Sequence, residues 1–241
     1  MKASLALAAL ALAAATNIAC AAPALEAWSI NIEPWGFEHT GEGIAPAFLS
    51  FIADSADVPL EVSVRPYLRA VEGLRSGQNA LSMLIPTPDR DAIAFVLCQP
   101  ATVRLSILYR RDIVGAASLP SDLVGRTIGM LRGSQVLATY AATVPFHASL
   151  VNTQEQGMRM MRAGRLDGTV CSYPGCRAAM RSVGLDMADF GEVSLGSHPL
   201  AVLVSRTSPL AEDKAALARL RAACESKEGQ RLMAALLARW D

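Results

Sequence analysis

Short apolar runs of strand character alternate with amphipathic helical patterns along the first third of the chain. The strand-like runs cover residues 29–32, 60–64 and 80–85. Between them lie two helical patterns, one with Ile44, Phe48, Phe51 and Ile52 on one face and one from Pro66 to Arg75. Such alternation is typical of βαβ units and of a mainly parallel sheet. The chain is therefore predicted to be an α/β protein.

The same alternation begins again after about residue 100. Predicted strands at 103–109, 127–131, 150–152 and 168–171 are separated by helical patterns, among them one from Ser134 to about Ala142 and one from Thr153 to Ala163. The segments Leu74–Ala80 and Met161–Gly168 also resemble each other, because each has a helix end, a glycine and a polar residue before an apolar strand. The two series predict two lobes built on one plan.

The amino-terminal residues have the features of a secretory signal peptide. A lysine precedes an apolar run from Ala3 to Ala15, which is too short to span a bilayer, and small residues follow it. We expect residues 1–22 to be the signal peptide, with cleavage at Ala21 or Ala22, and the mature chain to reach the periplasm. Lipid attachment at Cys20 is the less favoured alternative, because the three residues before it match a leucine-led lipidation site poorly.

The charge balance gives no support for a nucleic-acid partner. The sequence has 22 Lys and Arg against 22 Asp and Glu, and loss of Lys2 with the signal peptide leaves 21 basic residues. Such an even balance favours neither nucleic acid nor an anionic surface. No later segment has enough unbroken apolar residues to cross a membrane.

Four cysteines remain in the mature chain: Cys98, Cys171, Cys176 and Cys224. An exported compartment permits disulfides, and four cysteines allow three pairings, among which the sequence does not choose. A metal site is disfavoured, because Cys171 and Cys176 are separated by four residues and the three histidines are scattered. No metal and no cofactor are predicted.

The stretch from Leu84 to Arg90 closes an apolar run and presents an arginine just beyond two prolines. Proline fixes φ and has no N–H, so Pro86 and Pro88 predict a stiff turn after a strand. In parallel sheets, ligands bind beyond the carboxyl ends of the strands. Trp35, Phe37 and Arg90 each follow a predicted strand end, so we expect them at one rim, with Arg90 as the main candidate for ligand binding.

Over essentially the whole mature chain, the sequence resembles the bacterial extracellular solute-binding proteins of family 3, the polar amino-acid-binding type. The stretches that carry the resemblance are Pro34-Trp35 with Gly43-Ile44, Gly77 and Asn79 before a strand, Thr87-Pro88-Asp89-Arg90 with Phe95 to Pro100, Asp122 to Gly129 with Gly133-Ser134, and Gly164 to Asp167.

This resemblance implies a type II periplasmic-binding-protein fold, in which two α/β lobes are joined by two crossover strands with the ligand cleft between them. We place the crossings near Gln99 to Val103 and Val193 to His198. Lobe 1 then comprises residues 23–100 and a return segment, 196–241, and lobe 2 comprises residues 101–195. Such proteins close on their ligand by a hinge motion. The function implied is that of a monomeric periplasmic substrate-binding protein, with the membrane subunits of an ABC importer as possible partners.

The resemblance also implies roles for individual residues. Arg90 matches the arginine that grips a ligand carboxylate, and a guanidinium offers paired donors to such a group. Gly133 and Ser134 match the turn of the second lobe that meets the same carboxylate, and Trp35 matches the aromatic residue that lies against the ligand. The remaining candidates at the rim are Phe37, Ile85, Thr87 and Ser172.

Two departures from the family pattern point away from an ordinary α-amino acid. Amino-acid binders have an acidic residue where this chain has Ser172, and a hydroxyl cannot balance a buried ammonium. The strand end before Arg90, Met83-Leu84-Ile85-Pro86, is also poor in hydroxyl groups. A small organic anion, such as a carboxylate with an apolar body, fits these residues better.

Two other functions stay open. Some proteins of this fold are dehydratases of cyclic carboxylates, and the candidates for the acid or base that this chemistry needs are Glu33, Glu38 and His39. We interpret all three as surface charges, so no catalytic residue is predicted. A periplasmic sensory or accessory module without a transporter would have the same sequence features.

Overall fold

The computed structural model describes residues 25–134, 138 and 142–240. The predicted signal peptide, 1–22, and most of the helix predicted from Ser134 to about Ala142 lie outside the described residues.

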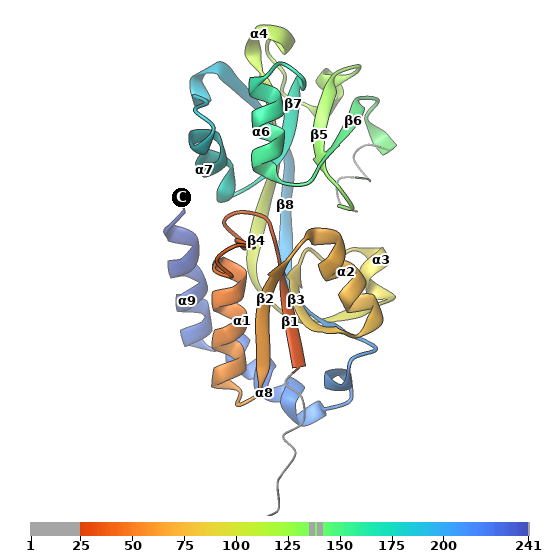
Figure 1. The fold of residues 1–241 in the computed structure, drawn as a ribbon, viewed down its shortest axis with the longest axis vertical. Helices are drawn as coiled ribbons and strands as arrows, with labels where there is room; N and C mark the ends of the chain where they lie inside the picture. The colour runs from red at the N-terminus through yellow and green to blue at the C-terminus, as the bar shows by residue number, and fades with distance from the viewer. Residues whose placement is uncertain (1–24, 135–137, 139–141, 241) are drawn as a thin grey trace, which may run out of the picture.

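Two α/β lobes are stacked along the long axis of the molecule (Figure 1). The described strands form one sheet in the order β2-β1-β3-β8-β4-β7-β5-β6. The strands are β1 Leu25–Ile30, β2 Leu60–Arg65, β3 Asn79–Leu84, β4 Ala94–Arg110, β5 Thr127–Leu131, β6 His147–Val151, β7 Gly168–Ser172 and β8 Phe190–Ser205. Within each lobe the outer strands are parallel, as the sequence predicts, because β2, β1 and β3 pair in parallel, as do β6, β5 and β7.

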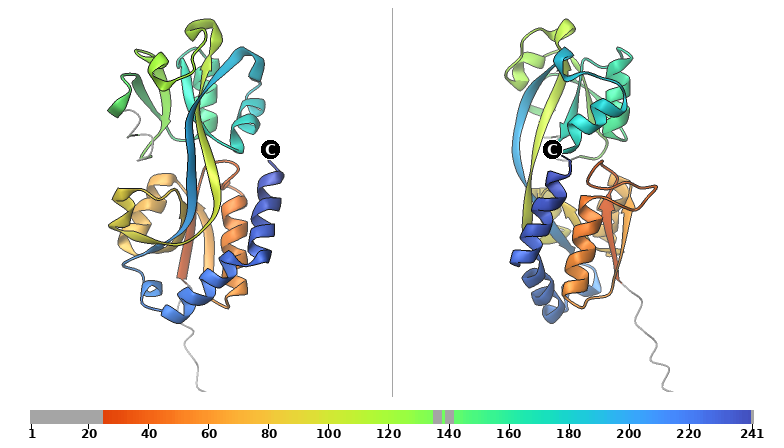
Figure 2. Two further views of the ribbon diagram at one scale, coloured as in Figure 1. Left: turned by 180° about the vertical axis from the view of Figure 1, so that it is seen from behind. Right: turned by 90° about the vertical axis from the view of Figure 1, so that its left-hand side faces the viewer.

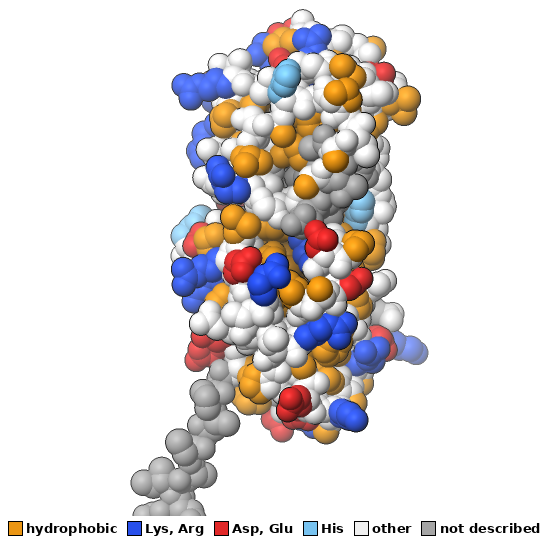
Figure 3. Space-filling model, turned by 90° about the vertical axis from the view of Figure 1, so that its right-hand side faces the viewer, with side chains coloured by type: hydrophobic (Ala, Val, Ile, Leu, Met, Phe, Trp, Pro, Cys, Tyr) orange, Lys and Arg blue, Asp and Glu red, His pale blue; other side chains and the backbone are white. Residues whose placement is uncertain are grey.

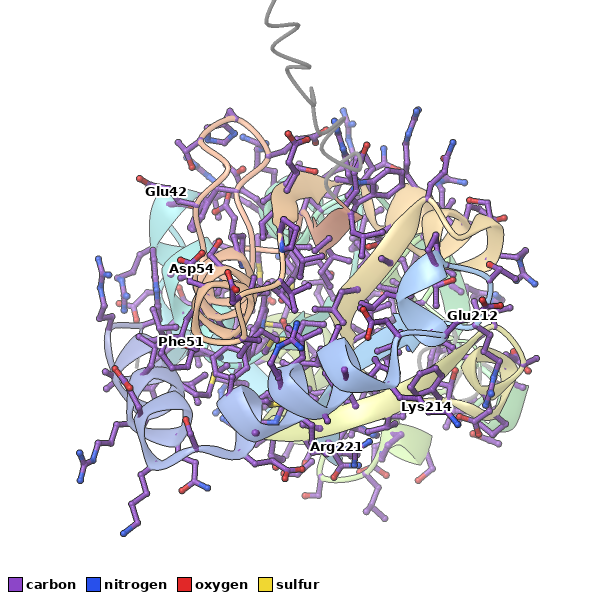
Figure 4. The ribbon with its side chains drawn as sticks, turned by 90° about the horizontal axis from the view of Figure 1, so that it is seen from below. Glu42, Phe51, Asp54, Glu212, Lys214 and Arg221 are labelled. Carbon is purple, nitrogen blue, oxygen red and sulfur yellow. A yellow bond between two sulfur atoms is a disulfide. The ribbon has the colours of Figure 1, made fainter. Side chains whose placement is uncertain are left out.

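Helices cover both parts of the sheet. They are α1 Ile44–Ser55, α2 Tyr67–Ser76, α3 Pro88–Asp91, α4 Arg111–Val114, α6 Gln154–Arg162, α7 Gly175–Ser182, α8 Lys214–Glu225 and α9 Lys227–Ala238, with 3₁₀ turns η1 Pro120–Leu123, η2 Met187–Asp189 and η3 Pro209–Ala211. In the lower lobe, α1, α8 and α9 lie together, so the C-terminal residues return to the lobe that contains β1 (Figure 1). Phe51 points from α1 toward these C-terminal helices (Figure 4).

Two long antiparallel strands, β4 and β8, run side by side through both lobes (Figure 2). The crossover strands that the resemblance places near Gln99 to Val103 and Val193 to His198 lie within β4 and β8. The register of the pair shifts between Cys98 and Ala101, where Pro100 has no N–H to donate. The boundaries proposed at residues 100 and 195 fall inside β4 and β8.

Cys98 pairs with Cys224, and Cys171 pairs with Cys176. The first disulfide links β4 to α8 in the lower lobe. The second joins the end of β7 to the first turn of α7 in the upper lobe. The structure thus selects one of the three pairings that the sequence leaves open.

Candidate functional site

A cavity of about 90 Å³ lies between the two lobes. Its walls come from both lobes and from the middle of β4, and most of the lining side chains are apolar. The lining residues are Ile30, Ile32, Trp35, Tyr67, Met83, Leu84, Ile85, Arg90, Val103, Leu105, Leu131, Ser134, Gln154, Val170, Cys171, Ser172 and Leu200. Hydrophobic side chains gather on the surface at the level where the lobes meet, with acidic and basic side chains just below them (Figure 3). An apolar cavity with a few polar groups is typical of a small-molecule site.

Arg90 is the charged residue among those that line the cavity. It belongs to the short helix α3, which begins at Pro88, and only 3% of its surface is exposed. Its Nη1 donates a hydrogen bond to the carbonyl oxygen of Ile85, and its Nη2 donates to the hydroxyl of Tyr67. The guanidinium carbon also lies 5.8 Å from the centre of the Tyr67 ring. Arg90 is therefore held against the lower wall of the cavity.

The positive charge of Arg90 has no carboxylate partner among the described residues. Its Nε is buried and has no hydrogen-bond acceptor there, and the same holds for Oγ1 of the neighbouring Thr87. The hydroxyl of Tyr67 accepts a hydrogen bond from Arg90, so its own proton remains for another acceptor. The lower wall therefore combines an uncompensated cation with unused donor groups.

The upper wall of the cavity is polar but uncharged. Gln154, at the start of α6, accepts a hydrogen bond from the backbone N–H of Ser172 at 2.6 Å through Oε1. Its Nε2 donates to the carbonyl oxygen of Glu33 at 3.1 Å. Because Glu33 belongs to the lower lobe, Gln154 links the two walls directly.

Five of the eight residues predicted to bind ligand line this cavity: Trp35, Ile85, Arg90, Ser134 and Ser172. The structure thus brings together side chains from four separate stretches of the chain. The backbone N–H of Ser134, however, donates to the carbonyl oxygen of Leu131 at 3.2 Å. The turn itself therefore uses the donor that the resemblance assigns to the ligand.

The other three predicted residues lie beside the cavity rather than in its lining. Phe37 packs against Trp240, with the ring centres 5.6 Å apart. Thr87 is the N-cap residue of α3, and its carbonyl oxygen accepts a hydrogen bond from the N–H of Arg90 at 2.8 Å. Gly133 has φ +82°, which favours glycine, and its Cα faces the side chain of Leu68 from the lower lobe. Gly133 therefore contributes a contact between lobes.

The two lobes also touch at a second place. Gly175, the first residue of α7, faces the carbonyl oxygen of Glu33 and the ring of Pro34 so closely that a Cβ atom there would clash with backbone. Together with the contact of Gly133 with Leu68, this packing joins the two lobes at two places.

The candidates for the dehydratase alternative, Glu33, Glu38 and His39, do not line the cavity. Glu38 and His39 are exposed, and Glu38 accepts a hydrogen bond from Asn31 at 3.0 Å. Burial raises the pKa of Glu33, and the negative charge of Glu155 in the upper lobe raises it further. Glu33 is thus a carboxylate at the contact between lobes, where it lies near the like charge of Glu155.

A hydrogen-bonded network lies behind the upper wall, on β4 and β8. Glu192 forms an ion pair with Arg104 and accepts hydrogen bonds from Ser106 at 2.6 Å and from the Tyr173 hydroxyl at 2.9 Å. Burial acts to raise the pKa of Glu192, but the hydrogen bonds from Ser106 and Tyr173 and the charge of Arg104 hold it below its ordinary value. Desolvation and the hydrogen bond to Glu192 raise the pKa of Tyr173. The charges of this network are compensated within the upper lobe.

The sequence analysis does not name Tyr67 or Gln154, although both line the cavity. Trp35 and Arg90 are predicted because ligands bind beyond the carboxyl ends of strands. The same rule, applied to every strand, would also find Tyr67 and Gln154. Tyr67 follows the end of β2, and Gln154 follows the end of β6. Their partners are distant in sequence, since Tyr67 is 23 residues from Arg90 and Gln154 is 121 residues from Glu33.

The described part of the chain contains no group of three or more histidine, cysteine or acidic residues that could hold a metal ion. Within that same part, every helix is too short or too polar to cross a membrane.

The paired strands β4 and β8, the two lobes and the cavity between them define a type II periplasmic-binding-protein fold. No model of a known protein family matches the sequence, and no curated protein matches it.

Solved structures match the fold along almost the whole chain. A histidine kinase sensor domain with similarity to periplasmic binding proteins has a TM-score of 0.75 at 18% identity, covering 90% of this chain and 96% of that one. The VFT2 domain of BvgS from Bordetella pertussis has a TM-score of 0.72 at 18% identity, with coverage of 91% and 94%. A mutant of ArgBP from T. maritima has a TM-score of 0.73 at 16% identity, with coverage of 90% and 95%. At this identity the likeness concerns the fold.

Proposed function

We propose that this chain is a periplasmic binding protein that captures a small organic anion, a carboxylate with an apolar body, between its two lobes. The observation that carries the proposal is the state of Arg90, a cation that is 97% buried and has no carboxylate partner among the described residues. A buried charge is strongly unfavourable unless an opposite charge and hydrogen bonds compensate it. An anionic ligand would supply both.

The arrangement of donors supports a carboxylate in particular. Nε of Arg90 is without an acceptor in the described residues, and the Tyr67 proton is available beside it. A carboxylate accepts several hydrogen bonds through its two oxygens, and each charged hydrogen bond contributes roughly 1.5–3 kcal/mol. The apolar side chains of Trp35, Ile85 and Leu131 would then contact the body of the ligand.

Delivery of the ligand to an ABC importer is the cellular role we propose. The fold supports this role, because one structure that matches it is described as the substrate-binding protein of an amino acid ABC transporter. We further propose that the protein acts as a monomer in the periplasm, after removal of residues 1–22. Binding without turnover is favoured over the dehydratase alternative, because Glu33, Glu38 and His39 lie outside the cavity lining.

A sensory role is the second candidate. It rests on the matches to the BvgS domain and to the histidine kinase sensor domain. The same binding event would then be reported to a sensor protein rather than to a transporter. Affinity purification from the native envelope distinguishes the two, because importer subunits would accompany a transport protein.

A thermal-shift screen of the mature chain against small carboxylates and amino acids tests the proposal. A ligand whose free concentration is 100 times its Kd stabilises the folded state by about 2.7 kcal/mol. We expect carboxylates with apolar bodies to raise the Tm and Arg90→Ala to remove this shift, because the variant lacks the guanidinium. Arg90→Lys keeps the charge without the paired donors, and its shift should be intermediate.

The matched control is Arg75→Ala, which removes an exposed arginine of the same lobe whose side chain is 58% accessible. This variant should bind as the unmodified protein does. The proposal would be contradicted if a ligand still raised the Tm of Arg90→Ala. Turnover of a cyclic carboxylate in the same screen would also contradict it.

A further inference from the structure

We propose that Gln154 determines the selectivity of the cleft, by making its upper wall unable to accept a ligand ammonium group. This inference rests on the proposed function and adds to it. It explains how a cleft that binds carboxylates would reject the amino acids that share their carbon skeletons.

The carboxamide of Gln154 is fixed at both ends. Its residue is 7% exposed, and its Oε1 accepts from the Ser172 N–H at 2.6 Å and lies 3.4 Å from the Ser172 hydroxyl oxygen. Its Nε2 donates to the carbonyl oxygen of Glu33 at 3.1 Å. An amide has one acceptor end and one donor end, so these partners define its orientation. A flipped amide would face the Ser172 N–H with a donor and the Glu33 carbonyl with an oxygen.

This orientation uses the acceptors that an ammonium group would need. An ammonium group carries three donors and a full charge, and its burial is unfavourable without a counter-charge. The residues that line the cavity include no aspartate or glutamate. Oε1 of Gln154 is already engaged by Ser172, and the carbonyl oxygen of Ile85 accepts from Arg90. A ligand ammonium would therefore meet uncharged hydroxyl groups and the positive charge of Arg90.

A change of one atom in Gln154 should reverse this property. In Gln154→Glu, one carboxylate oxygen can keep the hydrogen bond from the Ser172 N–H, and the second replaces Nε2. That second oxygen would face the carbonyl oxygen of Glu33, so two acceptors would lie against each other. A ligand ammonium placed between them would satisfy both and would neutralise the new charge.

The experiment compares matched ligands by isothermal titration calorimetry on the mature chain. The pair is 4-methylpentanoate and leucine, which differ by the α-ammonium group. We expect the unmodified protein to bind 4-methylpentanoate at least 10-fold more tightly than leucine. In Gln154→Glu, the ratio of the two affinities should shift toward leucine by 10-fold or more. If 4-methylpentanoate and leucine are too large for the cavity, butanoate and 2-aminobutanoate form the next pair of ligands.

Gln156→Glu is the matched control, because it adds the same charge to the same helix. Gln156 accepts a hydrogen bond from the N–H of Asn152 at 2.7 Å and does not line the cavity. The affinity ratio should not change in this variant. Should Gln154→Glu fail to fold, Ser172→Asp introduces a carboxylate on the same wall and should shift the ratio in the same direction.

The outcomes separate this inference from the proposed function. If no carboxylate binds, or if binding is independent of Arg90, the proposed function fails. If carboxylates bind through Arg90 but leucine binds equally well, Gln154 does not exclude ammonium and the inference is overturned. The inference is also overturned if the affinity ratio of the two ligands stays constant in folded Gln154→Glu or Ser172→Asp. An equal shift of this ratio in Gln156→Glu would overturn it as well.

Discussion

The two walls of the cleft differ in how they handle charge. The lower wall presents Arg90, which is buried and has no carboxylate partner in the described residues. In the upper lobe, Arg104 pairs with Glu192 behind the wall, and neutral groups of Gln154 and Ser172 face the cavity. Compensated charges point away from the site, and the uncompensated one lines it. Under the proposed function, the lower lobe provides the affinity for an anion and the upper lobe provides closure and selectivity.

Arg90 and Arg104 differ in exposure and in charge compensation. The side chain of Arg104 is 44% accessible, contacts Glu192, and its guanidinium carbon lies 3.7 Å from the centre of the Tyr173 ring. Such a partly exposed pair contributes little to stability, typically about 0–1 kcal/mol. The burial of Arg90 next to Tyr67 is unfavourable for the fold by itself, and under the proposed function a bound anion would compensate this charge. Such a site would lower the stability of the ligand-free protein for the sake of binding.

The disulfides give the largest expected difference between the lobes. Cys98–Cys224 joins residues separated by 126 positions, and Cys171–Cys176 joins residues separated by 5. Because closure of a longer loop removes more entropy from the unfolded chain, replacing the first pair by serine should lower the free energy of unfolding by about 5 kcal/mol, and the second by about 2 kcal/mol. Urea unfolding under non-reducing conditions measures both values.

Equal losses in the free energy of unfolding for the two pairs would show that unfolded-state entropy does not determine how much each disulfide stabilises the protein.

Ligand binding gives a second comparison of the two disulfides. Loss of Cys171–Cys176 should also weaken ligand binding, since Cys171 lines the cavity together with Ser172, the last residue of β7. Loss of Cys98–Cys224 should leave ligand affinity unchanged wherever the protein remains folded, because neither cysteine lines the cavity.

Substitution of Gly175, at the contact between the lobes, should cause a loss of ligand affinity of intermediate size. In Gly175→Ala, the new Cβ would clash with the backbone of Glu33, which cannot move aside as a flexible side chain can. The lobes should then close incompletely, and we expect a 10- to 100-fold loss of ligand affinity, which corresponds to about 1.4–2.8 kcal/mol. Calorimetry gives the affinity, and small-angle X-ray scattering should show a smaller ligand-induced compaction.

Gly133→Ala is the comparison for this contact. Its Cβ would meet the side chain of Leu68, which is 44% exposed and can rotate away. The penalty there comes from the positive φ of residue 133, roughly 1–2 kcal/mol of stability, and should not depend on ligand. Equal losses of affinity in the two variants would contradict the role assigned to Gly175.

Periodicity predicts the α/β class and most of the elements, because each strand or helix leaves a local pattern in the sequence. Trp35 and Arg90 could also be placed at the cavity, since each follows a predicted strand end. The full length of β4 could not be predicted, because periodicity indicates a strand only over 103–109 and the register shift at Pro100 depends on the partner strand. The orientation of Gln154 is likewise invisible in the sequence, since it depends on groups from two lobes.

The smallest expected effect is on stability and its dependence on pH, through the carboxylate of Glu33 at the contact between lobes. Burial, and then the charge of Glu155, raise the pKa of Glu33 above its ordinary value of 4.5. The folded protein therefore binds this proton more tightly than the unfolded chain, so stability decreases as the pH rises from 4.5 through the raised pKa. The whole penalty is present once the pH exceeds the raised pKa.

Glu33→Gln removes that penalty, so it should raise the free energy of unfolding at pH 7 by less than about 1 kcal/mol, because solvent screens much of the charge. It should also flatten the dependence of stability on pH above 4.5, the ordinary value. Glu155→Gln, in the upper lobe, removes only the second cause and also breaks the 2.8 Å ion pair with Arg159. Its stability at pH 7 should therefore stay below that of Glu33→Gln. Thermal unfolding from pH 4.5 to 7.5 measures both variants, and a larger gain in Glu155→Gln would mean that repulsion between the lobes outweighs burial.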